Sequence, residues 1–364
     1  MVKPSLSLFS IIMNLLGLLL ILLPFGYILL ISTTERDEDK LVSFHLWGGL
    51  FILFIYMLSF IFVEGPDKPL YLGSYLDAEN YYGSYSRELF WGQLQISLSS
   101  IFMKNETIYW LFYSFIYCMA YFVFAKKYFP EHLAGYFVLC VVGCMGFVSY
   151  GSNTIRAGFG LALVLFSFCT ENRWAKLFFA VVAVGCNMPM LIPVCGYLFA
   201  KYVIKKERWC EGIWILFFVI SATTSIISDI MMLLGGFDAR AEEYVNNDSI
   251  QNSYNVGFRL DFVIYSVVPA LFAKYNMKNL INDLPSYNTI YRAYLLVNSL
   301  WLLLIRMPFT DRFAYLSWFM IPFLLLYPVL NGYLNNQRPQ RYVLRAIGLF
   351  LLVNAALSLK TLLN

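Results

Sequence analysis

Histidine is nearly absent from this chain of 364 residues, which has only His45 and His132. Three short motifs are also absent: the G-x-S-x-G turn of serine hydrolases, the glycine-rich loop that cradles nucleotide phosphates, and the H-E-x-x-H pair of zinc peptidases. Charged residues make up only 13% of the composition, and the formal net charge is +4. The sequence therefore offers no sign of these motif-defined hydrolases, and its small charge does not point to nucleic acid.

Cysteine is missing from the long polar segments. The seven cysteines lie inside apolar runs or beside them: Cys118, Cys140, Cys144, Cys169, Cys186, Cys195 and Cys210. This placement shows neither a disulfide framework nor the spacing of a zinc site. We interpret these cysteines as small apolar residues in helix packing, and we expect no metal and no cofactor.

Apolar residues, in contrast, are abundant. They make up 60% of the chain, and the mean hydropathy is +0.65. Many runs carry almost no charge over the roughly 20 residues that a helix needs to cross a bilayer. The runs are continuous and do not alternate as the strands of an outer-membrane barrel do. The sequence therefore predicts an all-α polytopic membrane protein.

Twelve spans are predicted, within a single transmembrane domain over residues 1–364. They cover about residues 8–31, 43–63, 107–125, 132–149, 156–171, 174–188, 190–204, 212–233, 259–275, 288–306, 312–331 and 342–362. Two further stretches, 64–106 and 235–258, are too long and polar to be simple turns. Within the first of them, residues 89–102 are apolar but short, which favours a re-entrant or interfacial helix.

Lysine and arginine are unevenly divided between the two sides of these spans. The richer side holds loops 32–42, 126–131, 172–173, 201–211, 274–287 and 332–341. The positive-inside rule makes this side cytoplasmic, so both termini and both long loops are predicted to face outward. Both histidines then lie at cytoplasmic ends of spans. No outward histidine can serve as a general base, which argues against a histidine-dependent hydrolase or ligase on the outer face.

Several arginines stand singly on the outward side. Arg156, Arg259, Arg306 and Arg312 lie at helix ends, and Arg87 and Arg240 lie in the two long loops. A guanidinium grips phosphate or carboxylate with two parallel hydrogen bonds, which an ammonium does not. Arginines that converge on one outward cavity would form an anion site. In the alternative interpretation, each one anchors a helix end at the membrane surface.

The first long loop combines carboxylates with tyrosines. Asp77 and Glu88 stand near Tyr81, Tyr82 and Tyr85. Aromatic rings stack on the apolar faces of sugars, and carboxylates accept protons from sugar hydroxyls, so this loop suits a carbohydrate. Tyrosines are also common at the membrane interface for reasons unrelated to binding.

Two helix starts carry the most specific patterns. In "SNTIRAGFGLAL", Arg156 stands at the start of an apolar run, where a helix N-terminus attracts anions and Asn153 is a further candidate donor to the substrate. Gly158 and Ala162 in the same segment permit close helix packing. In "RMPFTDRFAYL", Pro308 separates Arg306 from the next helix. Thr310 or Asp311 can cap that helix, and Arg312 lies in its first turn.

The order of these segments resembles the EpsG family of polysaccharide polymerases, which is related to the Wzy polymerases of O-antigen and capsule. Its motifs are echoed by Gly73, Asp77 and Tyr81–Tyr82 in an outward loop, by Glu88 before a short apolar helix, by Arg156 with Leu161–Ala162, and by Arg312 with Tyr315 and then Pro322 or Pro328. The resemblance covers residues 40–330. It departs at "CNMPM", where Asn187 and Met188 replace a motif that contains histidine in the family.

The resemblance implies an architecture like that of GT-C glycosyltransferases in the cytoplasmic (inner) membrane. It implies that a growing glycan is transferred from polyprenyl diphosphate to a sugar hydroxyl of a second lipid-linked unit. We expect Arg156 and Arg312 to act on the diphosphate. Asp77 or Glu88 would accept the hydroxyl proton, with Asp311 and Asp261 as further candidates. The expected partners are the lipid-linked oligosaccharide, membrane lipid and a chain-length regulator protein, with no nucleic acid.

Two other classes stay open on the sequence alone. A twelve-helix secondary transporter or a flippase of lipid-linked oligosaccharide would place charge near the bilayer midplane at matching broken helices. No such pair is visible, and Asp229 is the only deep acidic candidate. An O-antigen ligase would share the donor but use a different lipid acceptor.

Overall fold

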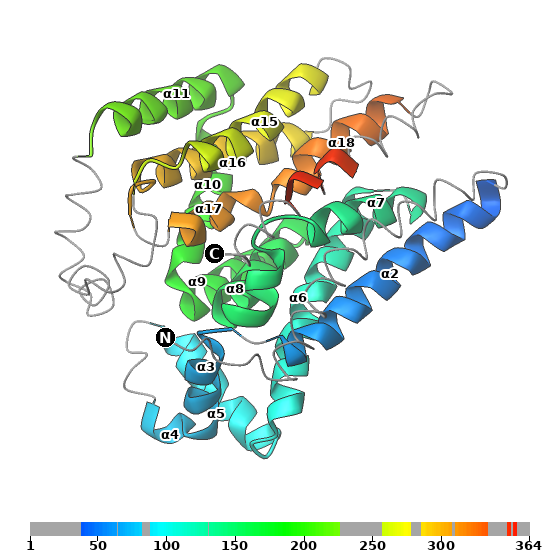
Figure 1. The fold of residues 1–364 in the computed structure, drawn as a ribbon, viewed down its shortest axis with the longest axis vertical. Coiled ribbons are helices and arrows are strands. Elements are labelled where there is room, and N and C mark those ends of the chain that lie inside the picture. Colours follow the sequence, from blue (N-terminus) through cyan, green and yellow to red (C-terminus); the bar gives the residue numbers. More distant parts are fainter. Residues whose placement is uncertain are drawn as a thin grey trace, which may run out of the picture. The chain divides into compact units, whose positions relative to one another are not determined.

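The computed structural model describes residues 38–63, 65–81, 88–129, 131–225, 257–277, 285–307, 310–333, 348–350 and 352–354. All regular structure within these ranges is helical, which confirms the all-α prediction (Figure 1). The predicted first span at 8–31, most of the loop at 235–258 and most of the last span at 342–362 lie outside the described residues. The chain forms two compact units: residues 1–191 with 333–364, and residues 192–332.

The first unit contains eight α-helices and two short irregular helices among its described residues. They are α2 (Glu38–Phe62), α3 (Lys68–Leu76), α4 (Ala78–Tyr81), α5 (Leu89–Ile101), α6 (Glu106–Tyr128), α7 (Glu131–Val142), the π-helix η2 (Ser149–Asn153), α8 (Ile155–Cys169), α9 (Arg173–Cys186) and the 3₁₀ turn η3 (Met188–Met190). Helix α8 packs against α6 and α9, while α2 packs against α6 and α7. Asparagine side chains set two of the starts, because Asn105 caps α6 and Asn172 caps α9.

Helix α6 is the one helix of the described residues that is both long and apolar enough to cross a membrane. It matches the predicted span at 107–125, and Lys126 and Lys127 occupy its last turn. Shorter apolar helices cover Trp47–Phe62, Ile155–Cys169 and Met188–Val203. The count of twelve spans and the GT-C-like architecture therefore stay predictions.

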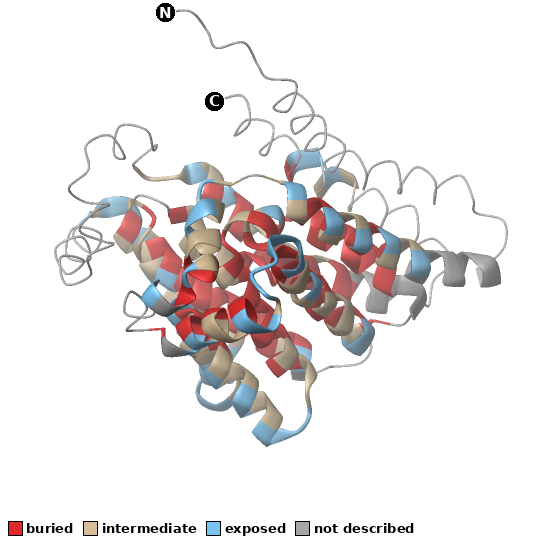
Figure 2. Cartoon of the chain, turned by 90° about the horizontal axis from the view of Figure 1, so that it is seen from below, coloured by how far each residue is buried: buried red, intermediate tan, exposed pale blue. Residues whose placement is uncertain are grey.

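Aromatic side chains fill the core of this unit. The Tyr75 and Tyr109 rings stack with centroids 4.1 Å apart, and the fully buried Trp91 lies 5.3 Å from Tyr113. Buried residues follow the inward faces of the helices, and exposed ones follow the outward faces (Figure 2). The outward face of α9 nevertheless carries large apolar side chains, such as Trp174, which suits contact with lipid.

The second unit contains α10 (Leu191–Leu198), the π-helix η4 (Phe199–Val203), α11 (Glu207–Thr223), α15 (Leu260–Met277), α16 (Pro285–Leu303), α17 (Thr310–Trp318) and α18 (Ile321–Tyr333). The buried Asn298 on α16 joins these helices. Its Oδ1 accepts a hydrogen bond from Trp214 Nε1 at 2.8 Å, and its Nδ2 donates to Ser266 and Ser317 hydroxyls. Such a satisfied polar network specifies one packing of four helices.

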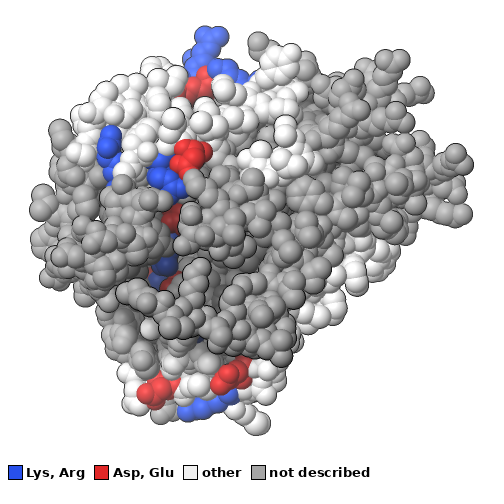
Figure 3. Space-filling model, in the orientation of Figure 1, with Lys and Arg blue, Asp and Glu red and all other residues white. Residues whose placement is uncertain are grey.

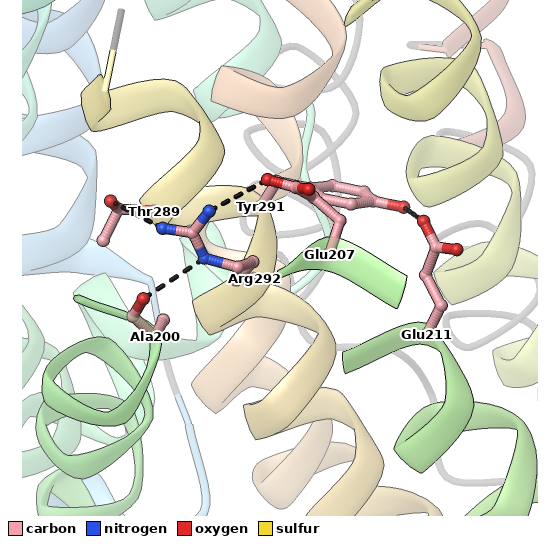
Figure 4. A network of polar contacts seen from close by, with 6 residues as sticks. All are labelled: Ala200, Glu207, Glu211, Thr289, Tyr291 and Arg292. Atoms are coloured by element: carbon pink, nitrogen blue, oxygen red, sulfur yellow. Dashed lines mark hydrogen bonds and ion pairs between the residues drawn. The ribbon is translucent and has the colours of Figure 1, made fainter. Parts of the chain in front are cut away.

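A second network surrounds the buried Arg292 (Figure 4). Its guanidinium donates to the Ala200 carbonyl at 3.2 Å, to Glu207 at 2.9 Å and to the Thr289 hydroxyl at 3.3 Å. Beside it, the Tyr291 hydroxyl donates to Glu211. Every guanidinium nitrogen has a partner, so Arg292 holds η4, α11 and α16 together as a structural residue.

Three predicted elements differ from the observed ones. The first long loop contains α3 and α4 besides the expected short helix, which is α5. The predicted span at 132–149 ends early, since α7 stops at Val142 and Gly146 adopts a φ of +88°, which glycine tolerates best. The predicted span at 312–331 is two helices, α17 and α18, separated by a turn at Phe319 and Met320.

Candidate functional site

Arg156 lies in the first turn of α8, where the chain changes from a π-helix to an α-helix. Thr154 leaves helical geometry with φ −93° and ψ +57°, and α8 begins at the next residue. The close approach of η2 to α8 requires glycine at position 158, since a Cβ there would lie 2.1 Å from the Tyr150 carbonyl oxygen. This confirms a packing role for Gly158. The packing of η2 against α8 at Gly158 fixes the position of the Arg156 backbone.

Glu88 reaches the same place from a different segment. It is the N-cap residue of α5, and its carboxylate Oε2 accepts a hydrogen bond from Arg156 Nη1. The other oxygen, Oε1, lies 3.5 Å from the backbone nitrogen of Met188, which donates to it. The side chains are only 10% (Glu88) and 16% (Arg156) exposed. Two predicted site residues thus form a mostly buried ion pair.

The helices that carry this pair begin side by side. One turn after Glu88 and Arg156, the rings of Trp91 and Phe159 are in contact, with centroids 6.4 Å apart. Helices α5 and α8 therefore both begin close to this ion pair. The positive ends of two helix dipoles meet here, which makes the place favourable for an anion.

Asn187 belongs to the same site, and the sequence-based predictions did not include it among the site residues. It is 4% exposed and directly precedes Met188, at the break between α9 and η3. Within the part of the chain that the structure describes, its carboxamide has no hydrogen-bond partner. Asn187 directly precedes the Met188 nitrogen that contacts Glu88, so its carboxamide is a candidate for ligand binding. The sequence signal that could have identified Asn187 is its position as a polar residue in "CNMPM", two positions before Pro189.

Asn153, a predicted substrate contact, is engaged within the protein. Its Oδ1 accepts a hydrogen bond from the Asp67 backbone nitrogen at 2.9 Å. A Cβ at Gly65 would lie 2.3 Å from the same oxygen, so only glycine fits there without a shift. Asn153 thus fastens the connection between α2 and α3 onto η2, close to the start of α8.

The remaining candidates of the first long loop are more exposed or outside the described residues. Asp77 is exposed at the end of α3, and its carboxylate accepts a hydrogen bond from Asn80 Nδ2 at 2.7 Å. Tyr81 ends α4. The predicted contacts Tyr82, Tyr85, Arg87 and Arg240 lie outside the described residues.

A second group of predicted residues gathers in the second unit. Arg259 forms a bidentate pair with Asp261, through Nε to Oδ1 at 3.0 Å and Nη2 to Oδ2 at 2.7 Å. The hydrogen bond to Asp261 raises the pKa of Arg259, Asp311 adds to this effect, and Arg312 interacts with Asp311. Burial raises the pKa of the Asp311 carboxyl, and this outweighs the opposing effects of Arg312 and Tyr315. On the face shown in Figure 3, charged side chains are few among the described residues.

Arg306 donates hydrogen bonds to backbone carbonyls within the protein. Its Nε donates to the Ser221 carbonyl at 3.3 Å and its Nη2 to the Ala222 carbonyl at 3.4 Å. These carbonyls belong to the last turn of α11, where a positive charge also complements the helix dipole. Arg306 thus caps α11 in this structure, and its predicted role in substrate binding stays untested.

Arg156 uses fewer of its guanidinium nitrogens as donors than Arg292, Arg259 and Arg306 do. Arg292 uses all three guanidinium nitrogens, and Arg259 and Arg306 each use two. Among contacts with described residues, Arg156 donates only from Nη1, to Glu88. Its Nε and Nη2 keep the two parallel donors that fit a phosphate.

The described residues are thus helical, and they include a helix long and apolar enough to cross a membrane and a mostly buried ion pair at two helix starts. The chain belongs to the EpsG family, which it matches over residues 45–361. This is a family of Wzy-like polysaccharide polymerases, so the chain is a membrane protein of polysaccharide biosynthesis. The match includes Glu88, Asn187, Arg156 and Arg312. No curated protein and no solved structure matches the chain.

Proposed function

We propose that this protein polymerises polyprenyl-diphosphate-linked oligosaccharide repeat units at the outer face of the cytoplasmic membrane. It transfers the growing glycan from one lipid carrier to a sugar hydroxyl of the next lipid-linked unit. The observation that carries the proposal is the Glu88–Arg156 pair at the joined starts of α5 and α8. Membership of the EpsG family supports the reaction class.

In this reaction the acceptor hydroxyl oxygen bonds to the anomeric carbon of the donor glycan. The bond between that carbon and the diphosphate oxygen breaks, and polyprenyl diphosphate leaves with the electron pair. Negative charge therefore builds on the diphosphate in the transition state. Preorganised donors at that position lower the barrier, and Arg156, with its unused Nε and Nη2, has the geometry to supply them.

The hydroxyl proton must go to a base, and Glu88 is the favoured candidate. It is the carboxylate in contact with Arg156, so a diphosphate held by Arg156 lies within reach of it. Asp77, the other predicted base, lies exposed beside Asn80 at the end of α3. A general base has to lie within hydrogen-bond distance of the proton that it takes. This requirement favours Glu88.

The charged cluster of the second unit is proposed to bind further parts of the two lipid-linked substrates. Two carriers bring two diphosphates, and one arginine cannot hold both. Arg259 and Arg312 are the candidate cations, and Asp261 and Asp311 are candidate acceptors for sugar hydroxyls. The lipid in this proposal is undecaprenyl diphosphate in the inner membrane, and a chain-length regulator is the proposed protein partner.

Reconstitution tests this function directly. The purified full chain is placed in lipid nanodiscs with a polyprenyl-diphosphate-linked oligosaccharide, and the products are separated by length. We expect a ladder of glycans together with free polyprenyl diphosphate. A ligase would add one glycan to a different lipid without a ladder, and a flippase would move the substrate across liposomes without forming a bond. Either of those results, with folded protein, would overturn the proposal.

A further inference from the structure

The Glu88–Arg156 pair conflicts with the roles proposed for its two members. This inference rests on the proposed function, which requires Arg156 to hold a diphosphate and Glu88 to accept a proton. In the structure each side chain is the partner of the other. The polymerase therefore has to exchange these partners during its reaction.

Glu88 and Arg156 do not use all of their hydrogen-bonding capacity, unlike the buried structural arginine of the same protein. Arg292 has a partner for every guanidinium nitrogen. Arg156 has one described partner, which leaves Nε and Nη2 for an incoming anion. On the carboxylate side, the contact of Oε1 with the Met188 nitrogen is 3.5 Å long, at the limit of a hydrogen bond. A competing anion can take over both contacts.

The surroundings suit an anion better than they suit Glu88 alone. Two helix starts, of 13 residues in α5 and 15 residues in α8, direct backbone N–H groups toward this place. The buried Trp91 Nε1, in the first turn of α5, has no partner among the described residues. Asn187, which directly precedes Met188, makes no side-chain hydrogen bond to them. Met188 is 54% exposed, so the site reaches the protein surface. These groups are additional donors for a ligand larger than one carboxylate.

We propose that Glu88 is a resident anion that occupies the position of the substrate's diphosphate. The diphosphate displaces the carboxylate from Arg156 and from the Met188 N–H, and the Asn187 carboxamide then donates to the diphosphate or to its first sugar. The released Glu88 carboxylate turns to the acceptor hydroxyl. Binding of the donor thus activates the base, and no base is free before a donor is bound.

The released carboxylate completes the proton balance of the transfer. As the acceptor oxygen bonds to the anomeric carbon, its proton moves to Glu88, and the diphosphate takes the electron pair of the broken bond. A carboxylate that has lost a cationic partner accepts a proton more readily. When the diphosphate leaves, Glu88 returns its proton to water and pairs with Arg156 again. This return helps to expel the spent carrier.

Binding of polyprenyl diphosphate without sugar tests the proposal. The full chain in nanodiscs is titrated with this lipid, and inorganic pyrophosphate is the second probe, which separates headgroup recognition from binding of the tail. In wild type the resident carboxylate lowers the apparent affinity, as a populated non-binding state does. We expect Glu88→Gln to bind both probes about tenfold or more tightly, and to polymerise far more slowly than wild type.

Glu106→Gln is the matched control, because Glu106 is an exposed carboxylate in the first turn of α6. It should change neither binding nor polymerisation. If Glu88→Gln is not recovered folded, Glu88→Asp replaces it, since a shorter acid reaches Arg156 less well and should also tighten binding.

Equal or weaker binding in the folded Glu88 variant would overturn the resident-anion proposal and leave the proposed function standing. Wild-type binding and polymerisation by Arg156→Ala would instead refute the proposed function.

Discussion

Glu88 and Arg156 lie 68 residues apart in the sequence and form an ion pair that is almost closed to solvent. Each residue stands at the start of a helix of more than ten residues, and the two helices begin together. A buried pair of this kind contributes little to stability, because desolvation of both charges offsets their attraction. Its position at two positive helix ends is better explained by binding of an anion.

Substitution of Arg156 distinguishes between two roles of this residue: binding the diphosphate and anchoring a helix end at the membrane surface. Lysine keeps the charge and the ability to snorkel, but it loses the planar fork. We therefore expect Arg156→Lys to slow polymerisation by a factor on the order of 10² or more, as loss of a transition-state donor does, and Arg156→Ala to be inactive. The measurement is the length of surface polysaccharide in a strain that lacks the native enzyme, at equal membrane abundance.

Arg173→Lys is the control for this change, since Arg173 is exposed at the start of α9. It should leave the chain length unchanged. Normal polysaccharide from Arg156→Lys would return Arg156 to the role of an anchor.

The two candidate bases should behave differently when converted to amides. Glu88→Gln removes a base in contact with Arg156, so we expect polymerisation to slow by a factor on the order of 10²–10⁴. Asp77→Asn changes an exposed residue whose contact is with Asn80, and a loss of less than about tenfold is expected for a group outside the reacting center. Initial rates of ladder formation with purified variants give the comparison. The reverse order of the two rates would move the base to Asp77.

Gly158→Ala should destabilise the first unit. The new Cβ would lie 2.1 Å from the Tyr150 carbonyl oxygen, which belongs to backbone and cannot move aside easily. We expect a loss of about 1–3 kcal/mol, the usual cost of overpacking, measured as a lower melting temperature of the detergent-purified protein. Gly212→Ala is the matched control, because no atom lies within 4 Å of a Cβ on Gly212 in α11. It should melt at the wild-type temperature or slightly higher. Equal melting of the two variants would contradict the close packing of η2 on α8.

The membrane orientation predicts that Asp77 faces outward. Cysteine at position 77, in a background with the seven native cysteines replaced, should react with an impermeant thiol reagent in whole cells. Cysteine at position 208 on α11 is the control, because Arg208 is exposed and lies on the predicted cytoplasmic side. It should react only after permeabilisation. The opposite pattern would reverse the orientation and exclude an outer-face polymerase.

Local patterns were sufficient to predict the helices and several of their ends. Continuous apolar runs predict helices because the period and the hydropathy are properties of neighbouring residues. The short helix after Glu88, the helix start before Arg156 and the tight packing at Gly158 all follow from such local signals. The pairing of Arg259 with Asp261 is local as well, since only one residue lies between them.

The tertiary structure decided which of the predicted polar residues meet. Arg156 and Arg306 have equivalent patterns in the sequence, yet Arg306 caps α11 through backbone carbonyls while Arg156 pairs with Glu88. Asn153 and Asn187 also look alike as polar residues at helix ends, but Asp67 engages the first and the second stays unpaired among the described residues. Hydropathy determines where helices form, because it depends on neighbours in the chain. Side-chain partners depend on which helix ends pack together, and only the folded chain determines that.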